Sequence, residues 1–390
     1  MKRLDRIEQV ARRYVDAGAL PGIEWNILRA GGSFARGRYG QGDPLNGVDM
    51  ADKPIYRIYS MTKPVVAAII MMALERGRLN LFDPLAAYLP EFAKMQVLAD
   101  DGSLVRAAPI TIEHLLTHRA GLSYGFLADC PVAALYRDTQ MHRGDMDFAE
   151  IVDLVATLPL AFQPGSKWQY SVATDVLGRV LEVIEGRRLG DIIADYISTP
   201  LGLTDTGFQV PPHAQARIAP VFGKSSINDV KEFATPPQKL IAADMSVEHP
   251  HDNPDFRRGG MGLFSTLDDY TLIARFLASG YAADGTRLLS RKSVEMLWTD
   301  RIPESQKPLA IGPFVFGGYG FGLGGRVMSN PGAALLPTSM GEHGWAGAAS
   351  TFFWIDPLED LIGVVMTQYL GSIIPIGEAF MTATYQALDP

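Results

Sequence analysis

The sequence predicts a mixed α/β fold of the α+β kind, in which helices from both ends of the chain flank an antiparallel sheet and a mostly helical domain is inserted between them. Two observations support this prediction. Strand-like segments occur near both termini, whereas the apolar spacing between Leu79 and Leu203 is mostly helical. The chain also has 390 residues, 47% of them hydrophobic, which is enough for one large two-part fold.

The N-terminal part shows a helix followed by a hairpin. Residues 1–8 begin with basic side chains but lack the continuous apolar stretch of a signal peptide, so we expect them to open an amphipathic first helix. Gly22–Leu28 and Ser33–Tyr39 are strand-like, and Ala30-Gly31-Gly32 between them is a hairpin signal. These two segments therefore provide the first strands of the sheet.

A strand-to-helix junction follows. Ile55–Tyr59 is a further strand-like segment, and a helical pattern runs from Ser60 to Arg76 and stops at Gly77. Ser60 is the expected N-cap because serine accepts hydrogen bonds from the first backbone N–H groups of a helix. The sequence thus places Ser60 at the joint between strand and helix.

The later segments complete the domain prediction. Residues 204–258 are rich in Pro, Asp and His and predict long loops, whereas Gly317–Val327, Ala349–Ile355 and Ile362–Gln368 predict strands before a closing helix. We therefore expect residues 1–78 and 255–390 to form an α/β sheet domain and residues 79–254 to form a helical domain with long loops. The active site is expected between them.

Composition excludes several functions. The net charge is -8 without a long single-sign block, which argues against nucleic acid as a partner. The longest apolar run, Pro64–Leu74, is too short to span a bilayer, so no membrane partner is expected. Cys130 is the only cysteine, which rules out an internal disulfide and argues against a cysteine-based metal site. A cytoplasmic location is the prediction that fits best.

Ser60-Met61-Thr62-Lys63 is an S-x-x-K pattern at a helix start. A spacing of three places the Ser60 hydroxyl and the Lys63 amine on one face, one turn apart. A lysine kept neutral by burial can remove the serine proton and activate it as a nucleophile. The pattern also arises by chance, so further elements are needed to support it.

Two further elements fit the same chemistry. Tyr170 follows the turn Gln163–Ser166 and precedes a helix, where its hydroxyl can share a proton with Lys63. Gly344–Ala349 precedes a strand, and its small residues allow a substrate to lie against the backbone. Each has an ordinary structural explanation when it is considered alone, namely packing for the tyrosine and a hairpin turn for the glycines.

Together, in this order and at these separations, the three elements resemble those of the serine β-lactamase and penicillin-binding-protein superfamily. The similarity is to the branch shared by class C β-lactamases and family VIII carboxylesterases, and it extends over nearly the whole chain. Three longer segments also show the similarity: Tyr56–Pro64, which contains the S-x-x-K pattern, Ile112–Leu122 and Phe353–Pro357. The resemblance implies a β-lactamase/transpeptidase-like fold and catalysis without a metal or organic cofactor.

The resemblance also implies roles for individual residues. Ser60 matches the nucleophile, Lys63 its general base and Tyr170 the tyrosine of the Y-x-N element. Trp345-Ala346-Gly347 matches the K-T-G element in the W-x-G form typical of the esterases. The backbone N–H groups of Ser60 and Ala348 would then form the oxyanion hole.

Two departures bear on the substrate. Val172 stands where β-lactamases have an asparagine, and Trp345 stands where they have a lysine that holds the β-lactam carboxylate. We expect Trp345, Gly347 and Val172 to contact the substrate, and the two replacements argue against efficient turnover of β-lactams.

Three other patterns point elsewhere and are set aside. Gly121–Gly125 fits G-x-S-x-G, but it follows a helix end and not the strand that a nucleophile elbow requires. His114 and His118 are four residues apart, as in a metalloprotease helix, yet the glutamate of that motif is missing, so capping and packing explain them better. Gly320–Gly325 fits G-x-G-x-x-G, but no helix follows, which indicates a Gly-rich strand.

The sequence therefore predicts a serine carboxylesterase that hydrolyses short-chain, small-molecule esters through an acyl-enzyme on Ser60. Alternatives with the same fold are a β-lactamase, a D-aminopeptidase or amidase, and an acyltransferase that passes the acyl group to an alcohol. A sensor that is acylated and then stalls is the alternative outside enzymes. Oligomeric state does not follow from the sequence.

Overall fold

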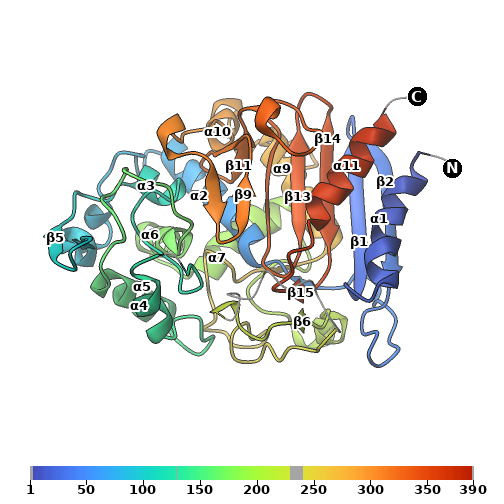
Figure 1. The fold of residues 1–390 in the computed structure, drawn as a ribbon, viewed down its shortest axis with the longest axis horizontal. Helices are drawn as coiled ribbons and strands as arrows, with labels where there is room; N and C mark the ends of the chain where they lie inside the picture. The colour runs from blue at the N-terminus through green and yellow to red at the C-terminus, as the bar shows by residue number, and fades with distance from the viewer. Residues whose placement is uncertain (1–2, 129, 229–239, 389–390) are drawn as a thin grey trace.

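The computed structural model describes residues 3–128, 130–228 and 240–388 and contains a seven-stranded sheet on one side of the molecule (Figure 1). The strand order is β10-β11-β12-β13-β14-β1-β2, and every neighbouring pair is antiparallel. The strands are β1 (Gly22–Arg29), β2 (Gly32–Gly40), β10 (Tyr319–Phe321), β11 (Arg326–Met328), β12 (His343–Ala346), β13 (Phe352–Asp356) and β14 (Leu361–Met366).

Strand β1 joins the two ends of the chain in one sheet. It pairs with β2 on one side and with β14 on the other, in a register that runs from Glu24 opposite Met366 to Arg29 opposite Leu361. Seven of its eight residues are buried, because both faces of the sheet are covered. An antiparallel sheet built from the two termini is what the sequence predicted.

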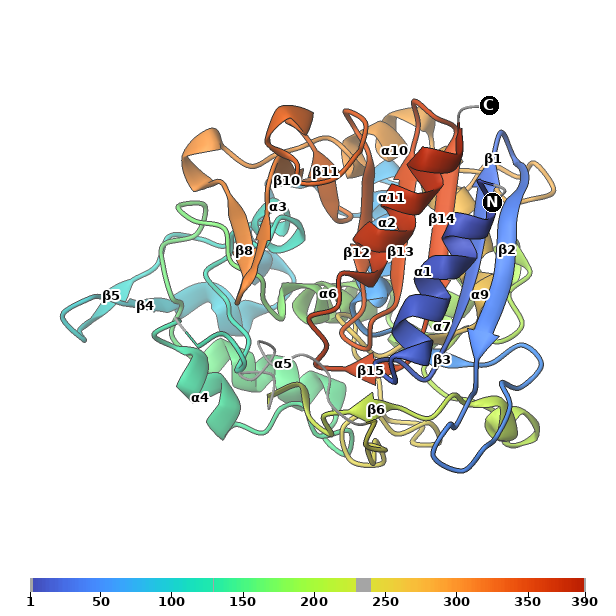
Figure 2. The ribbon, with the colours of Figure 1, turned by 45° about the vertical axis from the view of Figure 1, so that its right-hand side comes forward.

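Helices cover the two faces of the sheet. The helices are α1 (Asp5–Asp16), α2 (Thr62–Glu75), α3 (Ile112–Leu116), α4 (Ala133–Asp138), α5 (Phe148–Thr157), α6 (Ala173–Glu185), α7 (Leu189–Ile193), α8 (Thr199–Leu201), α9 (Leu267–Ser279), α10 (Arg291–Leu297) and α11 (Ile376–Leu388). Helices α1 and α11 lie side by side on one face (Figures 1 and 2), where Ile7 and Phe380 pack with Trp25 of β1. Helix α9 packs against β14 and β1 on the opposite face.

Helix α2 is the central helix of the molecule. All residues from Thr62 to Ala73 are buried, so the helix is apolar on every side instead of amphipathic. It contacts α9 and α10 on one side and α6 and α7 on the other, between the sheet and the helical region. Its N-terminus is fixed by two hydrogen bonds: the Tyr270 hydroxyl donates to the Met61 carbonyl, and Leu263 N–H donates to the Thr62 hydroxyl.

Four short two-stranded pairs complete the structure: β3 (Tyr56–Arg57) with β7 (Phe264–Ser265), β4 (Gln96–Leu98) with β5 (Leu104–Arg106), β8 (Leu309–Ile311) with β9 (Phe314–Phe316), and β6 (Phe222–Gly223) with β15 (Tyr369–Leu370). The β8–β9 hairpin extends beside the main sheet (Figure 2). Within the residues described, no helix is both long and apolar enough to cross a membrane.

The fold class is confirmed, but several boundaries differ from those expected. Ser60 is not an N-cap, because it lies in a 3₁₀ turn (Tyr59–Met61) and α2 begins only at Thr62. The strand expected at Ile55–Tyr59 shrinks to β3, since only two residues find a partner in β7. The single Gly-rich strand expected over Gly317–Val327 is instead the hairpin β10–β11. The division into two domains stays a prediction.

The loops expected over residues 204–258 are present in the part that the structure describes. The elements found there are a 3₁₀ turn at Pro212–Arg217 and β6. Residues 229–239 of the expected loop lie outside the described residues.

Candidate active site

Ser60 is held at the joint between β3 and α2 by an unusual backbone. The preceding residue, Tyr59, is fully buried and has a φ of 42°, a left-handed conformation that is uncommon for a residue with a side chain. Such conformations persist where the surrounding structure enforces them, and they concentrate at functional sites. Ser60 itself lines a cavity, so its hydroxyl faces an accessible space.

Lys63 lies one turn beyond Ser60 and makes three hydrogen bonds. Its amine nitrogen is 3.2 Å from the Ser60 hydroxyl, 3.0 Å from the Tyr124 hydroxyl and 2.7 Å from the Gly260 carbonyl oxygen. A neutral amine has two N–H groups and one lone pair. With the N–H groups donated to Gly260 and Tyr124, the lone pair is directed at the Ser60 hydroxyl.

The protonation state of Lys63 is set by burial. The side chain is buried, and the loss of solvation lowers its pKa to about 7, although the nearby Asp175 carboxylate opposes this effect. An ordinary lysine is neutral at pH 8 in only roughly 0.3% of molecules, whereas a pKa of about 7 makes roughly 90% neutral. Lys63 therefore meets the requirement for a base near neutral pH.

Tyr170 lies close to both Ser60 and Lys63. Its ring centroid is 4.6 Å from the Lys63 nitrogen, its hydroxyl is within hydrogen-bond reach of the Ser60 side chain, and it accepts a hydrogen bond of 3.2 Å from the Trp345 indole. Because the indole donates to it, the tyrosine proton is free to point to Ser60. Burial raises the pKa of Tyr170 well above its ordinary value, so it stays protonated at neutral pH.

The end of β12 brings backbone groups to the same place. Gly347 follows this strand, and a Cβ on it would collide with the Ile58 carbonyl oxygen, so only glycine lets β12 approach the chain before Ser60 so closely. Ser60 and Ala348 both line the cavity, and no hydrogen bond from either backbone N–H to another described residue is found. Two free N–H groups beside a nucleophile are the arrangement of an oxyanion hole.

The cavity in front of Ser60 has a volume of about 400 Å³ and mostly apolar walls. Its lining includes Phe126, Ile227, Ile311, Phe314, Phe316 and Ile374. Such a cavity favours an uncharged, apolar substrate. The described residues contain no group of three or more His, Cys, Asp or Glu side chains that is placed to hold a metal ion.

The structure thus brings six of the seven predicted site residues together. Ser60, Tyr170, Trp345, Gly347 and Ala348 line the cavity, and Lys63 lies directly behind Ser60. Val172 does not line it: its side chain packs inward as the residue before α6, 3% exposed. The expected contact between Val172 and the substrate therefore has no support in the geometry.

The patterns that were set aside lie away from the cavity. Ser123 of the G-x-S-x-G pattern is fully buried, and its hydroxyl donates a hydrogen bond to the Cys130 sulfur at 3.1 Å. His114 caps α3 through Thr111, as expected, but α3 ends at Leu116, so His118 is not on the helix with His114. His118 instead packs its ring 4.7 Å from that of Tyr170. The Gly320–Gly325 pattern spans the turn between β10 and β11.

Sequence reasoning missed three residues that hold Lys63. Tyr124 and Gly260 accept its hydrogen bonds, and Asp175 accepts a 2.9 Å bond from the Gly260 N–H while its carboxylate acts on the Lys63 charge. Asp175 therefore fixes the carbonyl that holds the lysine. The sequence held one indication of the role of Asp175. It lies five residues after Tyr170, and the predicted helix begins between them, so both residues lie near the N-terminus of that helix.

A buried Ser-Lys-Tyr cluster at the N-terminus of a central helix, beside an antiparallel sheet, is typical of proteins with the β-lactamase/transpeptidase-like fold. Comparison with known proteins agrees with this class. The family model described as Beta-lactamase matches residues 7–375, and the chain belongs to that family.

Relatives and solved structures are similar over nearly their whole length. Protein Rv1367c of Mycobacterium tuberculosis is 36% identical over 377 residues, covering 94% of this chain and 90% of the relative. Esterase EstB of Burkholderia gladioli is 30% identical over 399 residues, covering 98% and 94%. The solved structure of EstCE1, described as a hydrolase with promiscuous acyltransferase activity, is 25% identical with a TM-score of 0.82 and covers 98% of both chains.

Proposed function

We propose that the protein is a serine carboxylesterase that hydrolyses esters through an acyl-enzyme on Ser60. The observation that supports this most directly is the position of the Lys63 amine nitrogen, 3.2 Å from the Ser60 hydroxyl oxygen, where a neutral amine can accept the serine proton. A base in that position, with a pKa of about 7, can accept the serine proton at neutral pH.

The mechanism has two steps. In the first, Lys63 takes the Ser60 proton, the serine oxygen bonds to the ester carbonyl carbon, and the N–H groups of Ser60 and Ala348 hold the oxyanion. The bond to the alcohol then breaks as Tyr170 or Lys63 donates a proton to the leaving oxygen. In the second, water attacks the acyl carbon, releases the carboxylic acid and returns the proton to Ser60. Lys63 and Tyr170 act in one proton relay in both steps.

The chemistry of the cavity supports esters over β-lactams. Trp345 presents an indole where a β-lactam carboxylate requires a cation, and an unpaired carboxylate is costly to bury. A short acyl chain gains from the same apolar walls. The relatives named esterases, Esterase EstB among them, support the same assignment.

Acyl transfer to an alcohol is the second candidate. Relatives include the protein named Acyltransferase calJ of Penicillium decumbens, 27% identical over 334 residues. The apolar cavity favours it too, because an alcohol that binds there competes with water for the acyl-enzyme. Product analysis of one ester with and without added alcohol distinguishes transfer from hydrolysis.

The test compares two serines. Ser60→Ala should abolish hydrolysis of p-nitrophenyl butyrate and the transient acyl adduct seen by mass spectrometry, whereas Ser123→Ala should retain most activity because Ser123 is buried away from the cavity. Activity that survives in Ser60→Ala refutes the proposal. A permanent adduct on wild type without product release would indicate a sensor, and faster turnover of nitrocefin or a D-amino-acid amide than of the ester would indicate the other hydrolases.

A further inference from the structure

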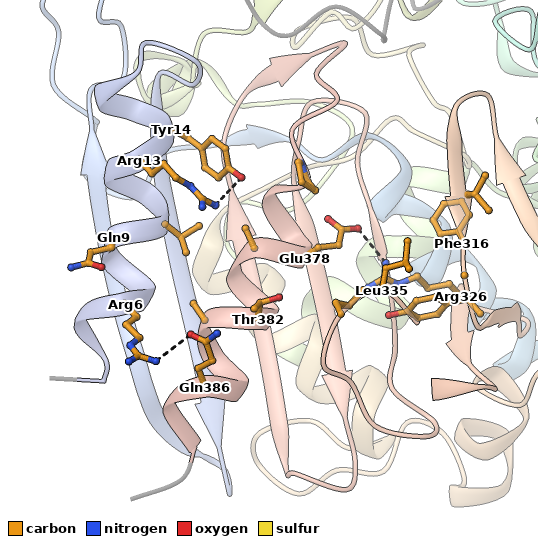
Figure 3. A pocket seen from close by; sticks show the side chains of 18 residues that line it. Arg6, Gln9, Arg13, Tyr14, Phe316, Arg326, Leu335, Glu378, Thr382 and Gln386 are labelled. Carbon is orange, nitrogen blue, oxygen red and sulfur yellow. Dashed lines mark hydrogen bonds and ion pairs between the residues drawn. The ribbon is translucent and has the colours of Figure 1, made fainter. Parts of the chain in front are cut away.

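A second cavity of about 900 Å³ lies on the outer side of the molecule, over the exposed face of α11 (Figure 3). Helix α1 borders it on one side, with Arg6, Gln9 and Arg13, and Phe316 of β9 borders it on the other. The exposed face of α11 forms its floor, with Thr382 near the middle. The mechanism proposed above makes no use of this space.

The second cavity shares a wall with the cavity in front of Ser60. Five residues line both of them: Val315, Phe316, Arg326, Pro375 and Glu378. The shared wall consists of the β8–β9 hairpin, the start of α11 and one arginine. The two cavities are therefore adjacent parts of one surface, separated only by these side chains.

The middle of the second cavity is apolar. Val10, Leu336, Ala379 and Ala383 contribute to its lining. Two large apolar side chains at its rim are unusually exposed: Leu335 at 94% and Val315 at 61%. Exposed apolar side chains that gather around a hollow mark a binding surface more often than isolated ones do.

The far end of the cavity is polar. Arg6 donates a hydrogen bond to Gln386 at 3.3 Å, and Arg13 donates to the Tyr14 hydroxyl at 2.9 Å. Neither arginine forms an ion pair with another described residue. A ligand that crosses the apolar middle thus reaches donors at the end.

Between the two cavities, Arg326 is fixed while Glu378 is held weakly. Arg326 is 4% exposed, pairs with Glu342 at 3.5 Å and lies over the rings of Tyr319 and Phe352. The Glu378 side chain is 39% exposed, and its ion pair with Arg326 is long, at 3.8 Å. A long, partly exposed ion pair adds little to stability. Rotation of the Glu378 side chain away from Arg326 therefore costs little free energy and widens the connection between the two cavities.

We propose that the two cavities form one binding site for an ester with a long apolar arm that ends in a polar head group. The carbonyl lies beside Ser60, the arm passes Phe316 and Glu378, and its far part lies over α11. The arm belongs to the acyl group or to the alcohol, since both leave the same carbonyl. This inference rests on the proposed esterase function and adds the class of substrate.

The experiment fills the second cavity without touching the first. Thr382→Trp places an indole on its floor, and Leu358→Trp is the matched control, because Leu358 is exposed in the turn between β13 and β14 and lines neither cavity. Two substrate series are compared below their critical micelle concentrations. One is p-nitrophenyl esters from butanoate to hexadecanoate, and the other is alkyl butanoates over the same range of alcohols.

In one of the two series, wild-type kcat/KM should rise with chain length, and the series in which it rises identifies the arm. Thr382→Trp should lower kcat/KM for the longest member by about tenfold or more and change the shortest by less than about twofold. Leu358→Trp should behave as wild type. A wild-type enzyme without preference for long chains in either series, or a Thr382→Trp variant that loses short and long substrates equally, overturns the proposal.

Binding of dansyl-labelled undecanoic acid to Ser60→Ala separates this inference from the proposed function. If the wild-type protein hydrolyses no ester, the esterase proposal fails. Binding of the dansyl probe to Ser60→Ala that is lost in Ser60→Ala/Thr382→Trp would still support a binding site that spans both cavities. If wild type hydrolyses short esters and the probe binds equally to both variants, the esterase proposal stands and the continuous site is refuted.

Discussion

Replacing Tyr124 by phenylalanine tests how the lysine base is held. The hydroxyl of Tyr124 is one of the three hydrogen-bond partners of Lys63, at 3.0 Å. Phenylalanine keeps the ring, so the burial that lowers the pKa of Lys63 to about 7 is retained and only the hydrogen bond is lost.

The direction follows from charge. A hydrogen bond to a charged group contributes about 1.5–3 kcal/mol and one between neutral groups about 1 kcal/mol, so the hydroxyl favours protonated Lys63 over neutral Lys63 by about 1 kcal/mol. Losing it should lower the pKa of Lys63 by roughly one unit, from about 7 towards about 6. The acidic limb of the pH profile of kcat/KM should move down by the same amount.

The assay is hydrolysis of p-nitrophenyl butyrate from pH 5 to pH 9, with initial rates corrected for the ionisation of p-nitrophenol. At pH 6 roughly 10% of wild-type Lys63 is neutral, against roughly 50% in the variant, so the ratio of variant to wild-type kcat/KM should be about fivefold higher at pH 6 than at pH 9. A second, descending limb is not expected in this range, because burial raises the pKa of Tyr170 well above it.

Tyr136→Phe is the matched control, since Tyr136 is also fully buried but makes no hydrogen bond to Lys63. Its profile should superimpose on that of wild type. An acidic limb that stays in place in Tyr124→Phe, or moves to higher pH, would refute the assignment of this limb to Lys63.

Three further predictions concern the rest of the site. Lys63→Ala and Tyr170→Phe should each lower kcat by orders of magnitude, and a double variant whose loss is the product of the two would contradict a shared proton relay. Trp345→Lys should raise kcat/KM for nitrocefin relative to that for p-nitrophenyl butyrate by about tenfold. Val172→Asn should only lower Tm, because Val172 lies in the core. A gain in nitrocefin hydrolysis from Val172→Asn alone would place that side chain at the substrate. Gly347→Ala should reduce both kcat and Tm, measured by rates and thermal melting, since its Cβ collides with the segment before the nucleophile; unchanged values would show that β12 can shift without cost.

The local part of the candidate site is the part that the sequence alone could predict. Ser60 and Lys63 are three residues apart, so one turn of backbone fixes their relation whatever surrounds them. Tyr124 and Gly260 reach the same lysine from positions 61 and 197 residues away in the chain. No local pattern encodes such contacts, because they depend on how α2 is packed between the sheet and the helical region.

Errors occurred where tertiary packing overrode local preference. Ser60 has the residue type of an N-cap, but the 3₁₀ turn around it shifts the start of α2 to Thr62 and leaves the serine hydroxyl available to Lys63. The contact of Val172 with the substrate stays a prediction, although its side chain is 3% exposed and is not part of the cavity lining. The second cavity had no counterpart in the sequence analysis, because α1 and α11 come from opposite ends of the chain.

The pairing of β1 with β14 has a consequence for biosynthesis. Glu24 cannot meet Met366 until the segment that carries β14 has left the ribosome, so the two strands that flank β1 are synthesised far apart in time. Contacts so distant in sequence make folding slow, and the unpaired edge of β1 in a nascent chain is open to wrong partners. Lys63 is synthesised long before β12, which carries Trp345 and packs between β11 and β13. A ribosome-bound chain is therefore expected to remain inactive until β11, β12 and β13 have all emerged.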